Sequence, residues 1–296
     1  MNVEMSYLLG MICGNGEIQR NSSETTVSIA IPHKKLETEE FHDVKLYVKA
    51  SITDMRNILE PLIGSGLNFI QNKSSTTLSF VKQNSDYLIR EIIRYIGNAL
   101  SHNDIILSKD IFSFTLDERK SFLKGFSDVT GYIRRSNCYF KKYQHRVYLE
   151  IPHNWQLVAD VSNLLKSVDI PVQNIDWAHP NMRDGNLVKY NSGNINFWKK
   201  EHQIKIWANE FLQIGFAVLH KQQALEIYAE ELIAGYKEIG KDPVKQTHKY
   251  YWDSKREVIK VKPSHLGEND ESLPETIRGK HFDSWKEIAK ELGYDK

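Results

Sequence analysis

The chain of 296 residues contains only two cysteines, Cys13 and Cys138. Two thiols are too few for a four-cysteine metal site or a disulfide framework, and such low cysteine content is typical of proteins from reducing compartments. The sequence also lacks an apolar run long enough to span a membrane, and its first residues lack the basic start of a secretory signal. We therefore expect a cytoplasmic, intracellular protein with no membrane partner.

An excess of one charge is also absent, because 39 Lys and Arg residues oppose 38 Asp and Glu residues and the net charge is +1. Any nucleic-acid site must then come from a local concentration of basic residues. The sequence contains no Gly-rich phosphate loop, no Ser/His/Asp cluster and no metal-binding set of Cys and His. Its composition, with 41% hydrophobic and 26% charged residues, is ordinary for a folded globular chain.

Two short stretches of the sequence resemble each other. Residues 7–18 read YLLGMICGNGEI, and residues 122–133 read FLKGFSDVTGYI. Both follow the pattern aromatic, Leu, any residue, Gly, apolar, four residues of any kind, Gly, any residue, Ile. The leucines at the second position, Leu8 and Leu123, are 115 residues apart (123 − 8). A spacing of about one small domain indicates an internal duplication.

Each of these stretches predicts a helix followed by a strand, because its apolar residues recur at helical spacing up to a glycine. Gly10 and Gly125 lie inside the helical pattern, where glycine costs about 1 kcal/mol relative to alanine. A close approach of two helix backbones would explain them, since only glycine leaves the room. Gly16 and Gly131 are expected to end the helices, with a strand beginning directly after each.

The rest of the pattern also recurs, because Ile-Pro-His follows a predicted strand at residues 31–33 and again at 151–153. In the first copy we predict strands over 25–31, 44–49, 67–71 and 76–81, and helices over 54–63 and from a cap at Asn84 or Ser85 to residue 96. In the second copy we predict strands over 147–151, 172–177 and 202–207, a helix after Asn154 and a last helix closed by Gly235.

The periodicity therefore predicts an α+β protein with a duplicated domain. Its expected parts are a first repeat and linker at 1–117, a second repeat at 118–238 and an extension at 239–296. Within the extension, Ser284 and Glu287 form a capping-box pattern, which predicts a terminal helix.

The paired stretches resemble the two motifs of single-chain LAGLIDADG homing endonucleases, and the resemblance covers residues 1–238. It implies two αββαββα halves whose motif helices pack together, with antiparallel strands forming a saddle over DNA. In that family each motif helix ends in an acidic residue that holds a shared divalent metal. The corresponding residues here are Asn15 and Thr130, and neither is a carboxylate. Glu17 and Asp128 are the nearest possible substitutes, although a structural role is the preferred interpretation of both.

Basic residues concentrate in the second copy, interleaved with tyrosines and glutamine. On an alternating strand pair one face would present Arg, Lys and Gln together, the types that read guanine and adenine edges in the major groove. The expected DNA contacts of this cluster are Tyr132, Arg134, Arg135, Lys141, Lys142, Gln144 and Arg146. Further contacts are expected from Gln19 and Arg20 in the first copy and from Arg183, Lys189 and Lys199 in the second.

The leading hypothesis is a monomeric, sequence-specific double-stranded DNA-binding protein that has lost strand cleavage and needs no cofactor. One alternative is a Mg²⁺-dependent DNA endonuclease of homing or restriction type, with Glu17 and Asp128 as unusual ligands. Another is an intron maturase that binds structured RNA. A protein partner would place the chain in a larger complex.

Overall fold

The fold is described from a computed structural model, which places residues 2–135, 145–152, 154–176, 201–238, 240, 252–253, 258–259 and 261–262. The first half begins with a helix and two strands, repeats strands after a second helix, and ends with a third helix. Its elements are α1 (Val3–Asn15), β1 (Gly16–Arg20), β2 (Glu24–Pro32), a short 3-10 helix (His33–Lys35), α2 (Val44–Ile63), β3 (Asn68–Gln71), β4 (Ser75–Gln83) and α3 (Tyr87–Ile96).

The second half repeats this order after a 3-10 helix at Lys109–Ser113. Its elements are α4 (Leu116–Thr130), β5 (Gly131–Arg134), β6 (Arg146–Pro152), α5 (Trp155–Lys166), β7 (Asn174–Asp176), β8 (Glu201–Trp207), α7 (Ala208–Phe211) and α8 (Leu219–Glu238). Three short strands follow, β9 (Trp252–Asp253), β10 (Val258–Ile259) and β11 (Val261–Lys262).

The two sheets have the same topology. The first has the strand order β1-β2-β4-β3, and the second has β5-β6-β8-β7 with β11 added beside β7. All pairs within the repeated part are antiparallel, while β11 runs parallel to β7. The predicted duplicated α+β fold is therefore confirmed. The expected boundary at residue 238 stays a prediction, because β11 joins residues of the extension to the second sheet.

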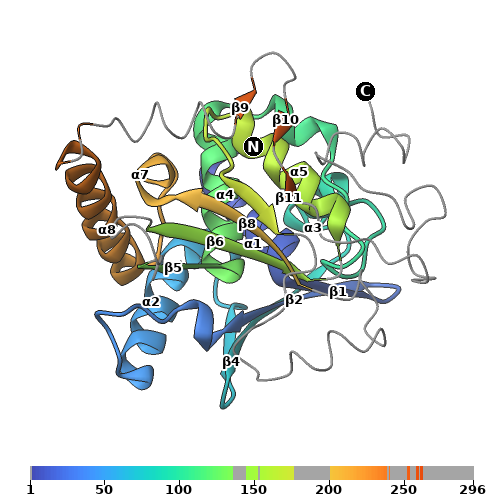
Figure 1. Cartoon of the computed structure of the whole chain (residues 1–296). Helices are drawn as coiled ribbons and strands as arrows, with labels where there is room; N and C mark the ends of the chain where they lie inside the picture. Colours follow the sequence, from blue (N-terminus) through green and yellow to red (C-terminus); the bar gives the residue numbers. More distant parts are fainter. Residues whose placement is uncertain are drawn as a thin grey trace, which may run out of the picture.

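Helices α1 and α4 pack against each other at the centre of the molecule, and the strands β6 and β8 cross in front of them in Figure 1. A Cβ atom on Gly10 would lie 1.9 Å from the carbonyl oxygen of Phe122, and one on Gly125 would lie 2.0 Å from that of Tyr7. Any side chain at either position would force the backbones apart. The two glycines therefore set the separation of the halves.

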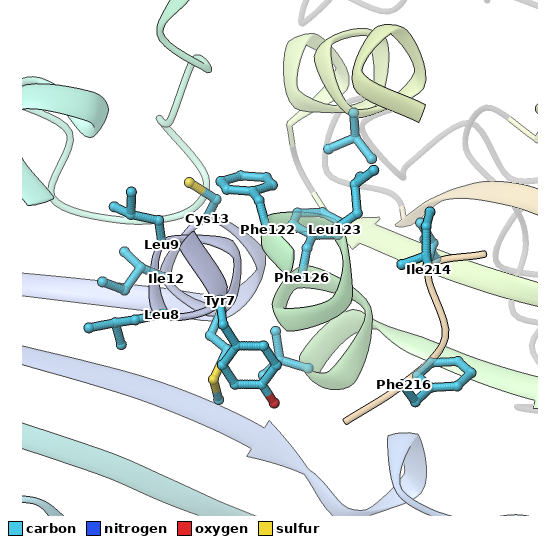
Figure 2. Packing of buried hydrophobic residues seen from close by; sticks show 14 of the residues in the cluster. Tyr7, Leu8, Leu9, Ile12, Cys13, Phe122, Leu123, Phe126, Ile214 and Phe216 are labelled. Atoms are coloured by element: carbon cyan, nitrogen blue, oxygen red, sulfur yellow. The ribbon is translucent and has the colours of Figure 1, made fainter. Parts of the chain in front are cut away.

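The hydrophobic core surrounds this helix pair. Figure 2 shows Leu8, Leu9 and Ile12 pointing away from α4, while Phe122 of α4 lies beside Cys13 of α1. The inner faces of the sheets close the core with side chains that alternate along the strands. These fully buried residues include Val27, Ile29 and Ile31 of β2 and Val147, Leu149 and Ile151 of β6. No helix of the described part is long and apolar enough to cross a membrane.

Three predicted elements differ in the structure. Residues 44–49 are not a strand, because they form the start of α2, which Asp43 caps by accepting from the amides of Lys45 and Leu46. Apolar and polar residues alternate over only six positions here, which is too short to exclude a helix. The buried residues that follow, Ser51, Met55 and Leu59, recur every four positions, which is the spacing of a helix. Helix α3 is capped by Asp86 rather than by residue 84 or 85. Helix α8 continues past the buried Gly235 to Glu238. The terminal helix expected from Ser284 lies outside the described residues.

Candidate nucleic-acid interface

The two motif helices end at Asn15 and Thr130, where the resemblance implies metal-binding acids. The Asn15 side-chain amide donates to the carbonyl oxygen of Ala30 on β2, with an Nδ2···O distance of 2.7 Å. The Thr130 hydroxyl is buried and donates to the carbonyl oxygen of Phe126, one turn earlier in α4, at 2.7 Å. Both side chains donate to backbone carbonyl oxygens, and neither brings the negative charge that a divalent cation requires.

Asp128, a candidate substitute ligand, lies in the core. Its Oδ2 accepts hydrogen bonds from the Tyr7 hydroxyl at 2.8 Å and from the Ala217 amide at 3.0 Å. The Lys221 ammonium lies 3.9 Å from Oδ1 and donates to the carbonyl oxygen of Gly131 at 2.9 Å. Burial raises the pKa of the Asp128 carboxyl and lowers the pKa of Lys221 to about 8. These contacts give Asp128 a structural role, and the expectation that it could bind a metal beside DNA is not supported.

Glu17, the other candidate substitute, is exposed on β1 and faces away from the core. Glu17 supplies one carboxylate, whereas the two motif positions of the resembled family supply two, and Mg²⁺ is usually held by one or two carboxylates together with phosphates and water. Within the described ranges, no group of three or more His, Cys, Asp or Glu side chains could hold a metal ion. In the part of the chain that the structure describes, Glu17 is therefore not joined by a second acid that would complete such a cluster.

The outward side chains of β5, β6 and β8 form the second-sheet face, which combines cations with aromatic rings. Arg134, Arg146 and Trp207 lie opposite one another across the three strands, as do Tyr132, Tyr148 and Lys205. The Tyr132 and Tyr148 rings stack with centroids 5.1 Å apart and planes 7° apart. The cations lie over these rings, with ring distances of 4.6 Å for Arg134 to Tyr132, 4.7 Å for Arg146 to Trp207 and 5.7 Å for Lys205 to Tyr148.

A residue from the first half crosses to this face, which the sequence did not predict. Lys35, in the 3-10 helix after β2, forms an ion pair with Glu150 on β6, and its ammonium lies 4.9 Å from the Tyr132 ring centroid. The Gln203 amide donates to the Tyr132 hydroxyl at 2.9 Å and to Glu150 at 3.1 Å. The side chains of Lys35 and Glu150 are only 6% and 12% exposed. This network joins the halves beside the helix ends, and only the tertiary structure reveals it.

Arg135 does not share a face with Arg134, contrary to the prediction. Its guanidinium makes two hydrogen bonds to the Glu231 carboxylate on α8, at 3.0 and 2.7 Å, and lies 3.5 Å from Glu40. The hydrogen bond and the charge of Glu231 raise the pKa of Arg135. His145 adds a contact to Glu231 at 2.9 Å. Arg135 therefore belongs to an acidic cluster that links α8 to the first half.

Gln19 and Arg20 also separate, because neighbouring side chains of a strand point to opposite faces. Gln19 pairs with Thr26 on the outward face of the first sheet, whereas Arg20 pairs with the buried Thr25. The remaining predicted contacts stay predictions, since they lie outside the described residues. They are Lys141, Lys142, Gln144, Arg183, Lys189 and Lys199.

No protein-family model and no curated protein matches the sequence. The chain is similar to the homing endonuclease I-DmoI, solved with its target DNA in the presence of manganese, at 16% identity and a TM-score of 0.41, covering 75% of this chain and 97% of that chain. It is also similar to full-length WhiA from Thermatoga maritima, at 12% identity and a TM-score of 0.43. This match covers 86% of this chain and 67% of that chain. The match to the N-terminal LAGLIDADG domain of WhiA has 12% identity and a TM-score of 0.37, and it covers 78% of this chain and 80% of that chain. The glycine-packed helix pair and the repeated strand order give this chain a duplicated LAGLIDADG-like fold.

Proposed function

We propose that this chain binds double-stranded DNA in a sequence-specific manner on a LAGLIDADG-like scaffold without the usual metal-dependent cleavage. The second-sheet face is the observation that carries the proposal. It carries Arg134, Arg146 and Lys205 on neighbouring strands of the sheet that begins at the end of α4, with Arg146 over the buried Trp207. Cations supply the attraction to phosphates, and a guanidinium can donate two hydrogen bonds to a guanine edge in the major groove.

The aromatic rings support duplex DNA over unpaired strands. Proteins that bind single strands stack bases on open aromatic rings. Here one face of Tyr148 stacks on Tyr132, and Lys205 lies over the Tyr148 ring. Arg134 and Lys35 in turn lie over the Tyr132 ring. Because the arginine and lysine side chains already lie over these rings, their conformations are restricted before DNA binds. The conformational entropy that they lose on entering the groove is therefore smaller.

The helix ends support binding without cleavage. Metal-dependent hydrolysis of a phosphodiester needs hard, charged oxygen ligands beside the scissile phosphate. The side chains at the two corresponding positions, Asn15 and Thr130, donate their hydrogens to backbone carbonyl groups instead. The usual metal position is thus occupied by neutral groups that already have structural partners.

Selection of the full chain on a randomised duplex-DNA library, with Mg²⁺ present, tests the proposal. We expect an enriched site of many base pairs whose strands remain intact. Defined new ends within the enriched site would mean that a metal site exists and would refute the loss of cleavage. Binding to structured RNA with no enrichment of duplex DNA would refute the proposed substrate.

A pair of matched variants tests the binding face. We expect Arg134→Gln and Arg146→Gln each to weaken binding to the selected site by about 1–3 kcal/mol and to reduce its dependence on salt. Arg90→Gln changes the net charge equally, on an exposed position of α3 away from the strands, and should leave affinity unchanged. Equal effects of all three substitutions would show that only net charge matters and would place the DNA elsewhere.

A further inference from the structure

The outward side chains of the first sheet form the first-sheet face, which differs in kind from its counterpart. Cross-strand pairs at its centre are Thr26 with Val81, Ser28 with Ser79, and Ala30 with Thr77. Apart from the exposed Val81, these side chains are half-buried, alternating with the fully buried residues of β2 and β4. None of the outward positions of β1 to β4 is a lysine or arginine.

Amide side chains flank this neutral centre. Gln19 of β1 pairs with Thr26 on one side, and Asn68 of β3 pairs with Ser79 on the other. Both amides are exposed. The face therefore offers hydroxyls and methyl groups in the middle and an amide at each edge, and the exposed Ile70 of β3, opposite Thr77, adds an apolar side chain beside Asn68.

These groups match one kind of base pair. Asn and Gln make paired hydrogen bonds to the N6 and N7 atoms of adenine, while methyl groups of Ala, Thr and similar residues contact the C5-methyl of thymine. Serine and threonine hydroxyls can bond to any base edge. Short side chains reach the bases only when the sheet lies close to the groove floor. The small residues at the centre of the face permit that approach, and the exposed Ile70 and Val81 add apolar groups that can contact thymine methyl groups. Arginine, which reads guanine, occupies outward positions only on the second-sheet face among the described strands, because Arg20 of β1 lies on the opposite side of the first sheet, opposite the buried Thr25.

The acidic residues of the first-sheet face agree with base contact rather than phosphate contact. Glu17 lies at the start of β1, and Glu24 lies at the start of β2, where it accepts a hydrogen bond from the Gln83 amide at 2.8 Å. No lysine or arginine stands opposite either acid in the pairing of the described strands. The two acids would repel phosphates, so we expect the contacts of this face to come from the neutral groups between them.

We propose that the two halves read opposite base compositions: the first-sheet face reads an A·T-rich half-site through thymine methyl groups and adenine edges, and the second-sheet face reads guanines. This inference rests on the proposed function. It predicts an asymmetric target in spite of the symmetric fold. The specificity-determining residues of the first half are Ala30, Thr77 and Thr26 for thymine, and Gln19 and Asn68 for adenine.

Base analogues test the inference on the site selected by the full chain. Each guanine is first replaced by 7-deazaguanine. Where this replacement weakens DNA binding by the wild type but not by Arg134→Gln, the guanine belongs to the half-site of the second-sheet face. In the other half-site, each thymine is replaced in turn by uracil, which removes only the C5-methyl. We expect about a threefold to fourfold loss of affinity for each methyl that the protein contacts, the value for burying one such group.

A double-mutant cycle then assigns the contact to a residue. Thr77→Ser keeps the hydroxyl and removes one methyl from the protein, so the variant should lose sensitivity to uracil at the thymine it contacts. Thr53→Ser makes the same change on an exposed position of α2 and should retain the wild-type sensitivity.

Each outcome decides one question. Uracil sensitivity confined to the non-guanine half-site, and removed by Thr77→Ser, supports the inference. An enriched duplex site in which uracil has no effect, or in which both halves require guanine, overturns it while leaving the proposed function intact. An enriched site that is contacted by the second-sheet face alone would also overturn the inference. The first-sheet face would then be a candidate surface for binding a protein partner. Absence of any duplex binding would refute the proposed function itself.

Discussion

Restoring an acid at the end of the first motif helix should destabilise the protein. In Asn15→Asp, the side chain can no longer donate to the Ala30 carbonyl oxygen, which lies 2.7 Å from the amide nitrogen. An ionised oxygen would instead face that carbonyl oxygen. The substitution also places a negative charge in the last turn of α1, at the negative end of the helix dipole.

The magnitude follows from these two changes. Leaving a partly buried acceptor without its donor costs about 1–3 kcal/mol. The charge at the helix end adds about 0.3–1 kcal/mol. We therefore expect the free energy of unfolding to fall by about 1.5–4 kcal/mol near neutral pH. Because the protonated acid can donate again, the pKa of the new carboxyl is raised in the folded state. The loss is present above that raised pKa and disappears as the pH falls below the unfolded value of about 3.9.

Urea unfolding of the wild type, Asn15→Asp and Asn15→Ala at about pH 7 and about pH 4 measures the effect. Asn15→Ala loses the same hydrogen bond without gaining a charge, so its deficit should not change between the two pH values. An Asn15→Asp variant as stable as the wild type at neutral pH would refute the reasoning. Specific stabilisation of that variant by Mg²⁺ would show that one acid suffices to rebuild a metal site, which contradicts the assignment of the helix ends.

Two further substitutions test the packing around the motif helices. Gly10→Ala places a methyl group 1.9 Å from the Phe122 carbonyl oxygen. It should lower the melting temperature, with a loss of about 1–3 kcal/mol in the free energy of unfolding. Gly66→Ala, with open space around the new methyl group, should have little effect. Lys221→Met leaves the Asp128 carboxylate buried without its cation and should cost about 3–5 kcal/mol in chemical denaturation; the added change Asp128→Asn should recover part of that loss, and no recovery would contradict the pairing.

Much of the fold could be predicted from the sequence because its strongest constraints are local. The pattern around Gly10 and Gly125 has a single good physical explanation, the close approach of two helices, and the structure places both glycines there. Strand alternation over 25–31 agrees with β2. The short segment 44–49 misled the prediction, because six alternating residues satisfy two periods and only the longer run to Ile63 distinguishes them.

The candidate site was less accessible to prediction, since it depends on which side of a strand each residue occupies and on contacts between distant segments. Arg134 and Arg135 are adjacent and chemically identical, yet one lies over Tyr132 and the other binds Glu231. A register fixed at Gly131 would have separated them by alternation. The contact of Lys35 with the second half has no local signal, because it joins residues more than one hundred positions apart.

The bonds between the halves also have a consequence for the history of the chain. Tyr7 of the first copy donates to Asp128 of the second, and in the aligned stretches the counterparts of these residues are Phe122 and Cys13. A symmetric dimer of second copies would set Asp128 against a phenylalanine without a hydroxyl, and a dimer of first copies would leave the Tyr7 hydroxyl facing a thiol. The first copy thus supplies the hydroxyl and the second copy supplies the carboxylate, and neither copy has both. This bond therefore exists only between unlike copies, and a homodimer of either half could not form it.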